Sequence, residues 1–137
     1  MSNVVVRAVR IRRPTQWYAM LTVLFLGARA VSTLAMDPGW DRPGTGWRSV
    51  LQLLICAVLL AGLLRRSWEI PAVLGIGALY TVLTVLEAFH GTDLLGVVPV
   101  DMRDRLVHPL LGVLAFGSAW LTRRMPTGAP ASGDLAG

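Results

Sequence analysis

The sequence predicts an all-α integral membrane protein, a four-helix bundle built as two helical hairpins. The first observation behind this prediction is a set of four long apolar runs, which are Trp17–Met36, Val50–Leu64, Ile70–Phe89 and Leu106–Thr122. About 20 apolar residues in a helix cover the ~30 Å hydrocarbon layer of a bilayer. The second observation is composition: 54% of the residues are hydrophobic and only 15% are charged, whereas an average soluble domain carries about 25% charged residues.

Three parts are expected along the 137-residue chain. Residues 1–16 form a basic cytoplasmic N-terminal arm, residues 17–124 form a four-span transmembrane domain, and residues 125–137 form a disordered cytoplasmic tail of small and polar residues. We place the spans at about 17–36, 48–64, 70–89 and 104–122.

Local signals justify each boundary in turn. Asp37, Pro38 and Gly39 form a strong helix stop after the first span. Few residues separate the second and third spans, so these two must form a tight antiparallel pair. Asp101 is a candidate N-cap for the last helix, where Asp104 would be favourable near the positive N-terminal end, and Pro109 is expected to kink that helix.

The distribution of arginine predicts the orientation. All thirteen basic residues are arginine, and eight of them fall on one side of the predicted spans: Arg7, Arg10, Arg12, Arg13, Arg65, Arg66, Arg123 and Arg124. The four on the other side, Arg42, Arg48, Arg103 and Arg105, are offset by five aspartates. Because cytoplasmic loops carry the excess of positive charge, both termini are expected in the cytoplasm of a cell-membrane protein.

Two charged residues lie within the apolar runs, Arg29 and Glu87. A charge near the bilayer centre costs roughly 2.5–3.5 kcal/mol on insertion scales, so it usually has a partner or water. The first and third spans run in the same direction, which predicts an intramembrane ion pair between Arg29 and Glu87. This pair has two interpretations: it fixes the helix register, or it binds a proton, an anion or a polar headgroup.

A second polar cluster is expected at the outer ends of the last two spans. Glu87 and His90 are spaced i,i+3, and Asp104 and His108 are spaced i,i+4, so each pair shares a helical face. Carboxylates and imidazoles in a helical bundle can serve as a ligand or proton site. The alternative is that His90 caps its helix and His108 bonds to Asp104 or to a neighbouring helix. We assign no metal and no catalytic residue to this cluster.

Known motifs of catalysis or cofactor binding are absent from the sequence. We find no Gly-rich phosphate loop, no Cys-x-x-Cys, no Ser–His–Asp order and no nucleotide fingerprint, and we assign no cofactor. The sequence pI near 11 would suggest nucleic acid in a soluble chain. Here the arginines lie at the ends of the spans, where anionic lipid headgroups are their natural partners, so the lipid bilayer rather than nucleic acid is expected as the contact.

The segment that opens the last span resembles a known pattern. Between Val98 and Gly112 the sequence is VPVDMRDRLVHPLLG. This resembles an actinobacterial four-helix integral membrane family of unknown function, whose last span opens P-x-N-x-x-D-x-x-L-H-x-x-x-G. Pro99, Asp104, His108 and Gly112 match the pattern, whereas Asp101 stands in place of its asparagine. The family often repeats a histidine motif at the second span, where this chain has Gln52. The resemblance implies a small membrane protein without an assigned catalytic residue.

These observations give one leading functional hypothesis and two alternatives. The leading hypothesis is a non-enzymatic accessory or structural membrane subunit, as a homo-oligomer or within a larger membrane complex. The first alternative is a membrane enzyme or a metal- or redox-binding protein that uses the outer cluster of Glu87, His90, Asp104 and His108. The second is a transport or proton-conducting subunit that uses Arg29 and Glu87.

Overall fold

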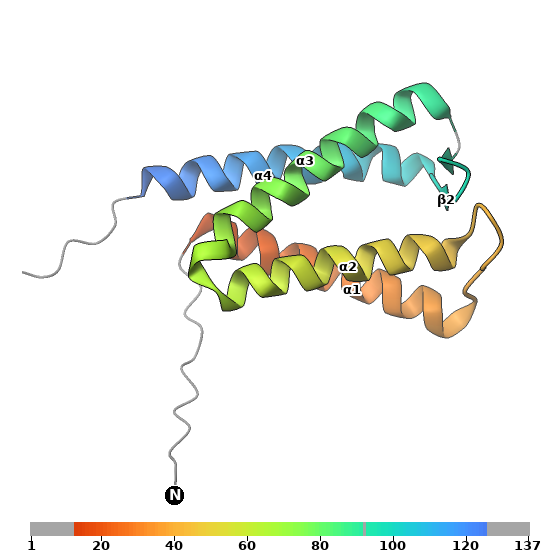
Figure 1. Ribbon diagram of the computed structural model, residues 1–137, viewed down its shortest axis with the longest axis horizontal. Coiled ribbons are helices and arrows are strands. Elements are labelled where there is room, and N and C mark those ends of the chain that lie inside the picture. The colour runs from red at the N-terminus through yellow and green to blue at the C-terminus, as the bar shows by residue number, and fades with distance from the viewer. Residues whose placement is uncertain (1–12, 92, 126–137) are drawn as a thin grey trace, which may run out of the picture.

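Four long helices form almost the whole of the structure, a computed structural model that describes residues 13–91 and 93–125. The helices are α1 (Pro14–Met36), α2 (Thr45–Leu64), α3 (Arg66–His90) and α4 (Met102–Arg124). They pack as two antiparallel hairpins, α1 with α2 and α3 with α4 (Figure 1). The predicted all-α fold of helical hairpins is confirmed. The expected arm at residues 1–12 and tail at 126–137 lie outside the described residues.

Three of the helices are long and apolar enough to cross a membrane, namely α1, α2 and α3. At 1.5 Å per residue their 23, 20 and 25 residues extend about 30 to 37 Å, which matches the hydrocarbon thickness. The helix α4, also of 23 residues, does not reach the same hydropathy within the described chain. It packs along α3 and α1, and its crossing of the membrane stays a prediction.

Most helices begin a few residues before the predicted spans. Pro14, which falls within the predicted arm of residues 1–16, is instead the first residue of α1. Proline suits this position because its fixed φ is helical and the first N–H of a helix has no partner in any case. The helix α3 starts at Arg66 rather than at about residue 70, so only Arg65 lies outside helix between α2 and α3. The predicted tight antiparallel connection is therefore confirmed.

A short β-ribbon lies between α3 and α4. Strands β1 (Asp93–Leu94) and β2 (Val98–Pro99) pair antiparallel. Leu95 and Gly96 form the turn with φ of 55° and 69°, a left-handed conformation that glycine adopts without a Cβ clash. The Gly44 N–H donates to the Val97 carbonyl at 3.0 Å, so the loop between α1 and α2 is bonded to this ribbon. Pro109 lies inside α4, which continues through it without a break.

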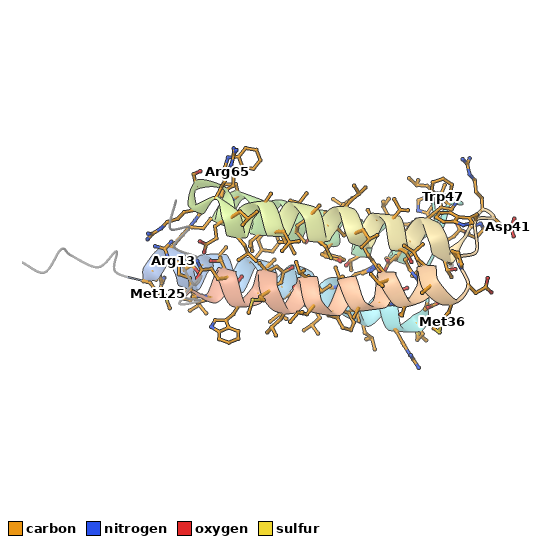
Figure 2. All side chains as sticks on the ribbon, turned by 90° about the horizontal axis from the view of Figure 1, so that it is seen from below. Arg13, Met36, Asp41, Trp47, Arg65 and Met125 are labelled. Atoms are coloured by element: carbon orange, nitrogen blue, oxygen red, sulfur yellow. The ribbon has the colours of Figure 1, made fainter. Side chains whose placement is uncertain are left out.

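The two ends of the bundle differ in which segments they collect. Arg13, Arg65 and Met125 lie at one end, and Met36, Asp41 and Trp47 lie at the opposite end (Figure 2). The first end therefore holds the start of α1, the α2–α3 connection and the end of α4. The second end holds the α1–α2 loop and the β-ribbon (Figure 1).

Each helix turns one narrow stripe toward the core. The buried positions of α2 recur at helical spacing and are Gly46, Ser49, Gln52, Ile55, Cys56, Leu59 and Gly62. The exposed positions are large and apolar on all four helices, for example Leu24, Leu54, Val82 and Val113. This inside-out pattern is expected where lipid surrounds the protein, because small and hydrogen-bonding residues then mediate helix contacts.

The helices α3 and α4 pack closely at Gly77. A Cβ placed on Gly77 would lie 2.9 Å from the Cβ of Ala115 on α4, which is closer than real carbon contacts. A Cβ on Gly75, in the same helix, would meet nothing within 4 Å. The two glycines therefore offer a matched test of how tightly the second hairpin is packed.

We predict that Gly77→Leu lowers the free energy of unfolding by about 1–3 kcal/mol, because overpacking forces the two helices apart. Gly75→Leu should leave the stability unchanged or slightly higher, since leucine is the better helix former. Unfolding of the purified protein in mixed micelles, followed by circular dichroism, measures both. Equal stability of the two variants would contradict the close contact at Gly77.

Candidate functional site

The centre of the candidate site is Asp104, in the first turn of α4. Its side chain is only 2% exposed, and it is held there because Asp101 and Asp104 form the N-terminus of α4. The Asp101 N–H donates to Asp104 Oδ2 at 3.2 Å, a capping contact that the sequence predicted in outline. The negative carboxylate also lies at the positive end of the helix dipole.

Two arginines from other helices bind this carboxylate. Arg29 of α1 donates through Nη1 to Asp104 Oδ1 at 2.7 Å, and Arg48 of α2 donates through Nη1 to Oδ2 at 3.2 Å. The more exposed Asp101 completes the network, with Arg48 at 2.9 Å and Arg29 at 3.6 Å. Two positive and two negative charges therefore balance within one cluster that joins α1, α2 and α4. We call these four residues the arginine–aspartate cluster.

The predicted ion pair between Arg29 and Glu87 is not formed. Within residues 13–91 and 93–125, the ion-pair partners of Arg29 are Asp101 and Asp104, and the partner of Glu87 is His108. The physical reason is the order of the helices around the bundle. The helix α1 packs against α2 and α4 more than against α3, so Arg29 reaches the carboxylates that start α4.

A second pair beside this cluster is formed by Glu87, which is buried, and His108, which is half-buried. His108 Nδ1 and Glu87 Oε1 share a hydrogen bond, and the Tyr80 ring lies against the imidazole with the ring centroids 5.3 Å apart. Glu87 is 3% exposed, and its second oxygen, Oε2, has no hydrogen-bond partner among the described residues. The pair fastens α3 to α4, and it leaves one buried carboxyl oxygen unused.

A small cavity lies between the two polar groups. It has a volume of about 20 Å³, and its polar lining comes from Arg48, Gln52, Asp104 and His108. Gln52 is 7% exposed, and its Oε1 is buried without a partner in the described chain. A volume of this size holds about one water molecule.

The outer cluster predicted from sequence is brought together only in part. Glu87 and His108 are in contact, whereas Asp104 is engaged by the arginines. His90 is exposed, and its Nδ1 lies 3.2 Å from the Leu86 carbonyl of its own helix. This contact agrees with the alternative interpretation, in which His90 caps the end of its helix. Over residues 13–91 and 93–125, no three His, Cys, Asp or Glu side chains are arranged to hold a metal ion.

A further polar group at the opposite end of the bundle was missed by sequence reasoning. Glu69 of α3 is 3% exposed and accepts hydrogen bonds from the Thr15 hydroxyl and, at 3.4 Å, from Gln16 Nε2. Thr15 also donates its backbone N–H to the Thr122 hydroxyl of α4 at 3.2 Å. Glu69 stands directly before the predicted third span, which begins at Ile70, and no pattern in the sequence singles it out.

One protein family matches this chain over more than half of its length. The sequence profile of a domain of unknown function, DUF4383, matches residues 43–121. The chain belongs to the DUF4383 family. The predicted resemblance to an uncharacterised family is thereby confirmed, while its actinobacterial origin and its sequence motif stay predictions. No curated protein and no solved structure matches the chain.

The DUF4383 match covers α2, α3 and α4 up to Leu121, but it does not cover α1. It therefore includes Arg48, Glu87, Asp104 and His108, whereas Arg29 comes from the helix outside it. The polar site of this chain is assembled from the DUF4383 region and from one arginine that α1 adds.

We predict that Asp104→Asn lowers the free energy of unfolding by about 3 kcal/mol, because two largely buried guanidinium groups lose their main counter-charge. Asp101→Asn is the matched control, since Asp101 contacts the same two arginines but its side chain is 54% exposed. Its loss should stay below about 1 kcal/mol, as for exposed ion pairs. A denaturation series in detergent compares them, and a smaller loss for Asp104→Asn than for Asp101→Asn would exclude Asp104 as the centre of the cluster.

Proposed function

We propose that this chain is a non-enzymatic accessory or structural subunit of the cell membrane, with four spans and both termini in the cytoplasm. The observation that carries the proposal is that the charged groups of the polar core pair with one another. Arg29 and Arg48 are neutralised by carboxylates of the same chain, and the cavity beside them is about 20 Å³. Substrate pockets usually enclose about 300–1,000 Å³ with convergent polar groups.

The placement of arginine supports the proposed orientation. Arg13, Arg65, Arg66, Arg123 and Arg124 adjoin the helix ends that gather at one end of the bundle. The opposite end carries Asp37, Asp41, Asp93 and Asp101 beside its arginines. This asymmetry follows the positive-inside rule and favours the first end as the cytoplasmic one.

The arrangement of charge supports a structural role for the polar residues. Sliding α1 by one helical turn, about 5.4 Å, would carry Arg29 out of hydrogen-bond range of Asp104. The cluster therefore fixes the register of α1 and α2 against α4. A bundle whose cluster charges are paired and whose outer surface is apolar is suited to packing against other membrane helices.

The experiment that tests this proposal measures the size of the complex that the chain forms in its native membrane. We predict that the tagged protein, extracted from native membranes with a mild detergent, migrates in a complex larger than one chain. Native electrophoresis with mass spectrometry of the band measures this and separates a homo-oligomer from a mixed complex. A monomer at every detergent concentration would contradict the accessory role.

A proton-handling role is the second candidate, and the unpartnered Oε2 of buried Glu87 is the observation that favours it. A carboxyl that contacts an imidazole and keeps a free oxygen has the parts that proton relays in membranes use.

We predict that Glu87→Gln lowers the stability by about 1–2 kcal/mol by weakening the bond to His108, and that it changes no proton flux. Proton uptake by liposomes containing the protein, with a pH-sensitive dye, measures the flux. Glu69→Gln is the control, as a buried glutamate of the same helix at the other end. Flux in the wild-type protein that Glu87→Gln alone abolishes would replace the structural proposal by the proton-handling one.

A further inference from the structure

An apolar groove runs along the surface between α1 and α4. It has a volume of about 800 Å³, and its walls are almost entirely apolar. Trp17, Leu21 and Phe25 of α1 form one wall, and they are 52%, 58% and 49% exposed. Val113 and Leu114 of α4, 70% and 49% exposed, lie on the other. The Tyr18 hydroxyl donates to the Leu111 carbonyl at 3.1 Å and ties the two helices beneath the groove.

A polar mouth continues this groove at one end. A second hollow of about 530 Å³ contains Arg29, Asp101 and Arg103, and it shares Phe25 and Val107 with the groove. The two hollows therefore form one continuous depression, which is charged at one end and apolar along the rest.

Arg103 is the charged residue of the mouth for which no side-chain bond is found among the described residues. It is exposed, and neither a hydrogen bond nor an ion pair to it is found within residues 13–91 and 93–125. Arg29 and Asp101, by contrast, bind each other and the rest of the arginine–aspartate cluster. The mouth thus offers one free guanidinium, the group that best matches the oxygens of a phosphate.

The spacing between the mouth and the groove fits one leaflet of a bilayer. From Arg103 to Leu114 there are 11 residues, or about 16 Å of helix. Half of the ~30 Å hydrocarbon layer is about 15 Å, the depth that one acyl chain fills. A phosphate at Arg103 would therefore place its acyl chain along Val107, Val113 and Leu114.

We propose that this depression is a binding site for one anionic phospholipid, with its phosphate on Arg103 and an acyl chain in the groove between α1 and α4. A second copy of the chain is the less suitable occupant, because it would bring another arginine-bearing surface to the same mouth. The mouth of the site borders the arginine–aspartate cluster, because Arg29 and Asp101 line both, and the proposal does not depend on the accessory role proposed above.

The test measures lipid retained by the full-length protein. The purified protein is exchanged into detergent with equal amounts of phosphatidylglycerol and phosphatidylcholine of the same acyl chains, and native mass spectrometry counts the bound lipids. We expect one retained phosphatidylglycerol, preferred about fivefold, since one arginine near a lipid surface contributes roughly that factor. Arg103→Gln should abolish the preference between headgroups, and Val113→Trp, which fills the groove, should reduce retention of both lipids.

Matched controls separate the site from ordinary lipid contact. Arg42→Gln removes another exposed arginine from the same end of the bundle, and Val85→Trp adds the same bulk at a position on α3 that is 51% exposed. Neither control should change retention. Equal headgroup preference in wild type and Arg103→Gln, unchanged retention in Val113→Trp, or a dimer that Val113→Trp disrupts would each overturn the proposal.

Discussion

The buried carboxylate of Asp104 is the constraint on which the bundle depends. It accepts hydrogen bonds from Arg29 of α1, from Arg48 of α2 and from the backbone N–H of Asp101 at the start of its own helix. A carboxylate or a guanidinium alone at this depth would cost several kcal/mol, and each is tolerable only because the others are in place. The favoured arrangement of three helices is therefore the one in which these charges meet.

Polar contacts gather at the two ends of the bundle, and the middle is mainly apolar. Asp104 and Thr122 lie 18 residues apart on α4, or about 27 Å, which is close to the thickness of the hydrocarbon layer. At the Thr122 end, Thr15 and Glu69 join α1, α3 and α4 without a cation. At the Asp104 end the bonds are charged. Because apolar packing alone discriminates weakly between helix registers in lipid, these two polar ends are what align the helices.

The positions of the helices could be predicted from the sequence, but the ion-pair partners of the charged residues could not. Long apolar runs predicted four helices, and the small number of residues between the second and third runs predicted the tight connection. Arg29 and Glu87 were recognised as intramembrane charges, but their partners depend on which helices are neighbours, and composition does not encode that. Arg48 was counted only as an arginine at the outer ends of the spans, and no role was predicted for Glu69. Their burial follows only from the packed arrangement.

The connection at Arg65 has a consequence for how the chain enters the bilayer. One residue of extended backbone covers about 3.5 Å, so α2 and α3 cannot be displaced separately along the membrane normal by more than a fraction of a turn. Neither helix can stay in water while the other is inserted in lipid. We therefore expect the two helices to enter the bilayer as a joined pair, in which Gly62 lies against Ala72.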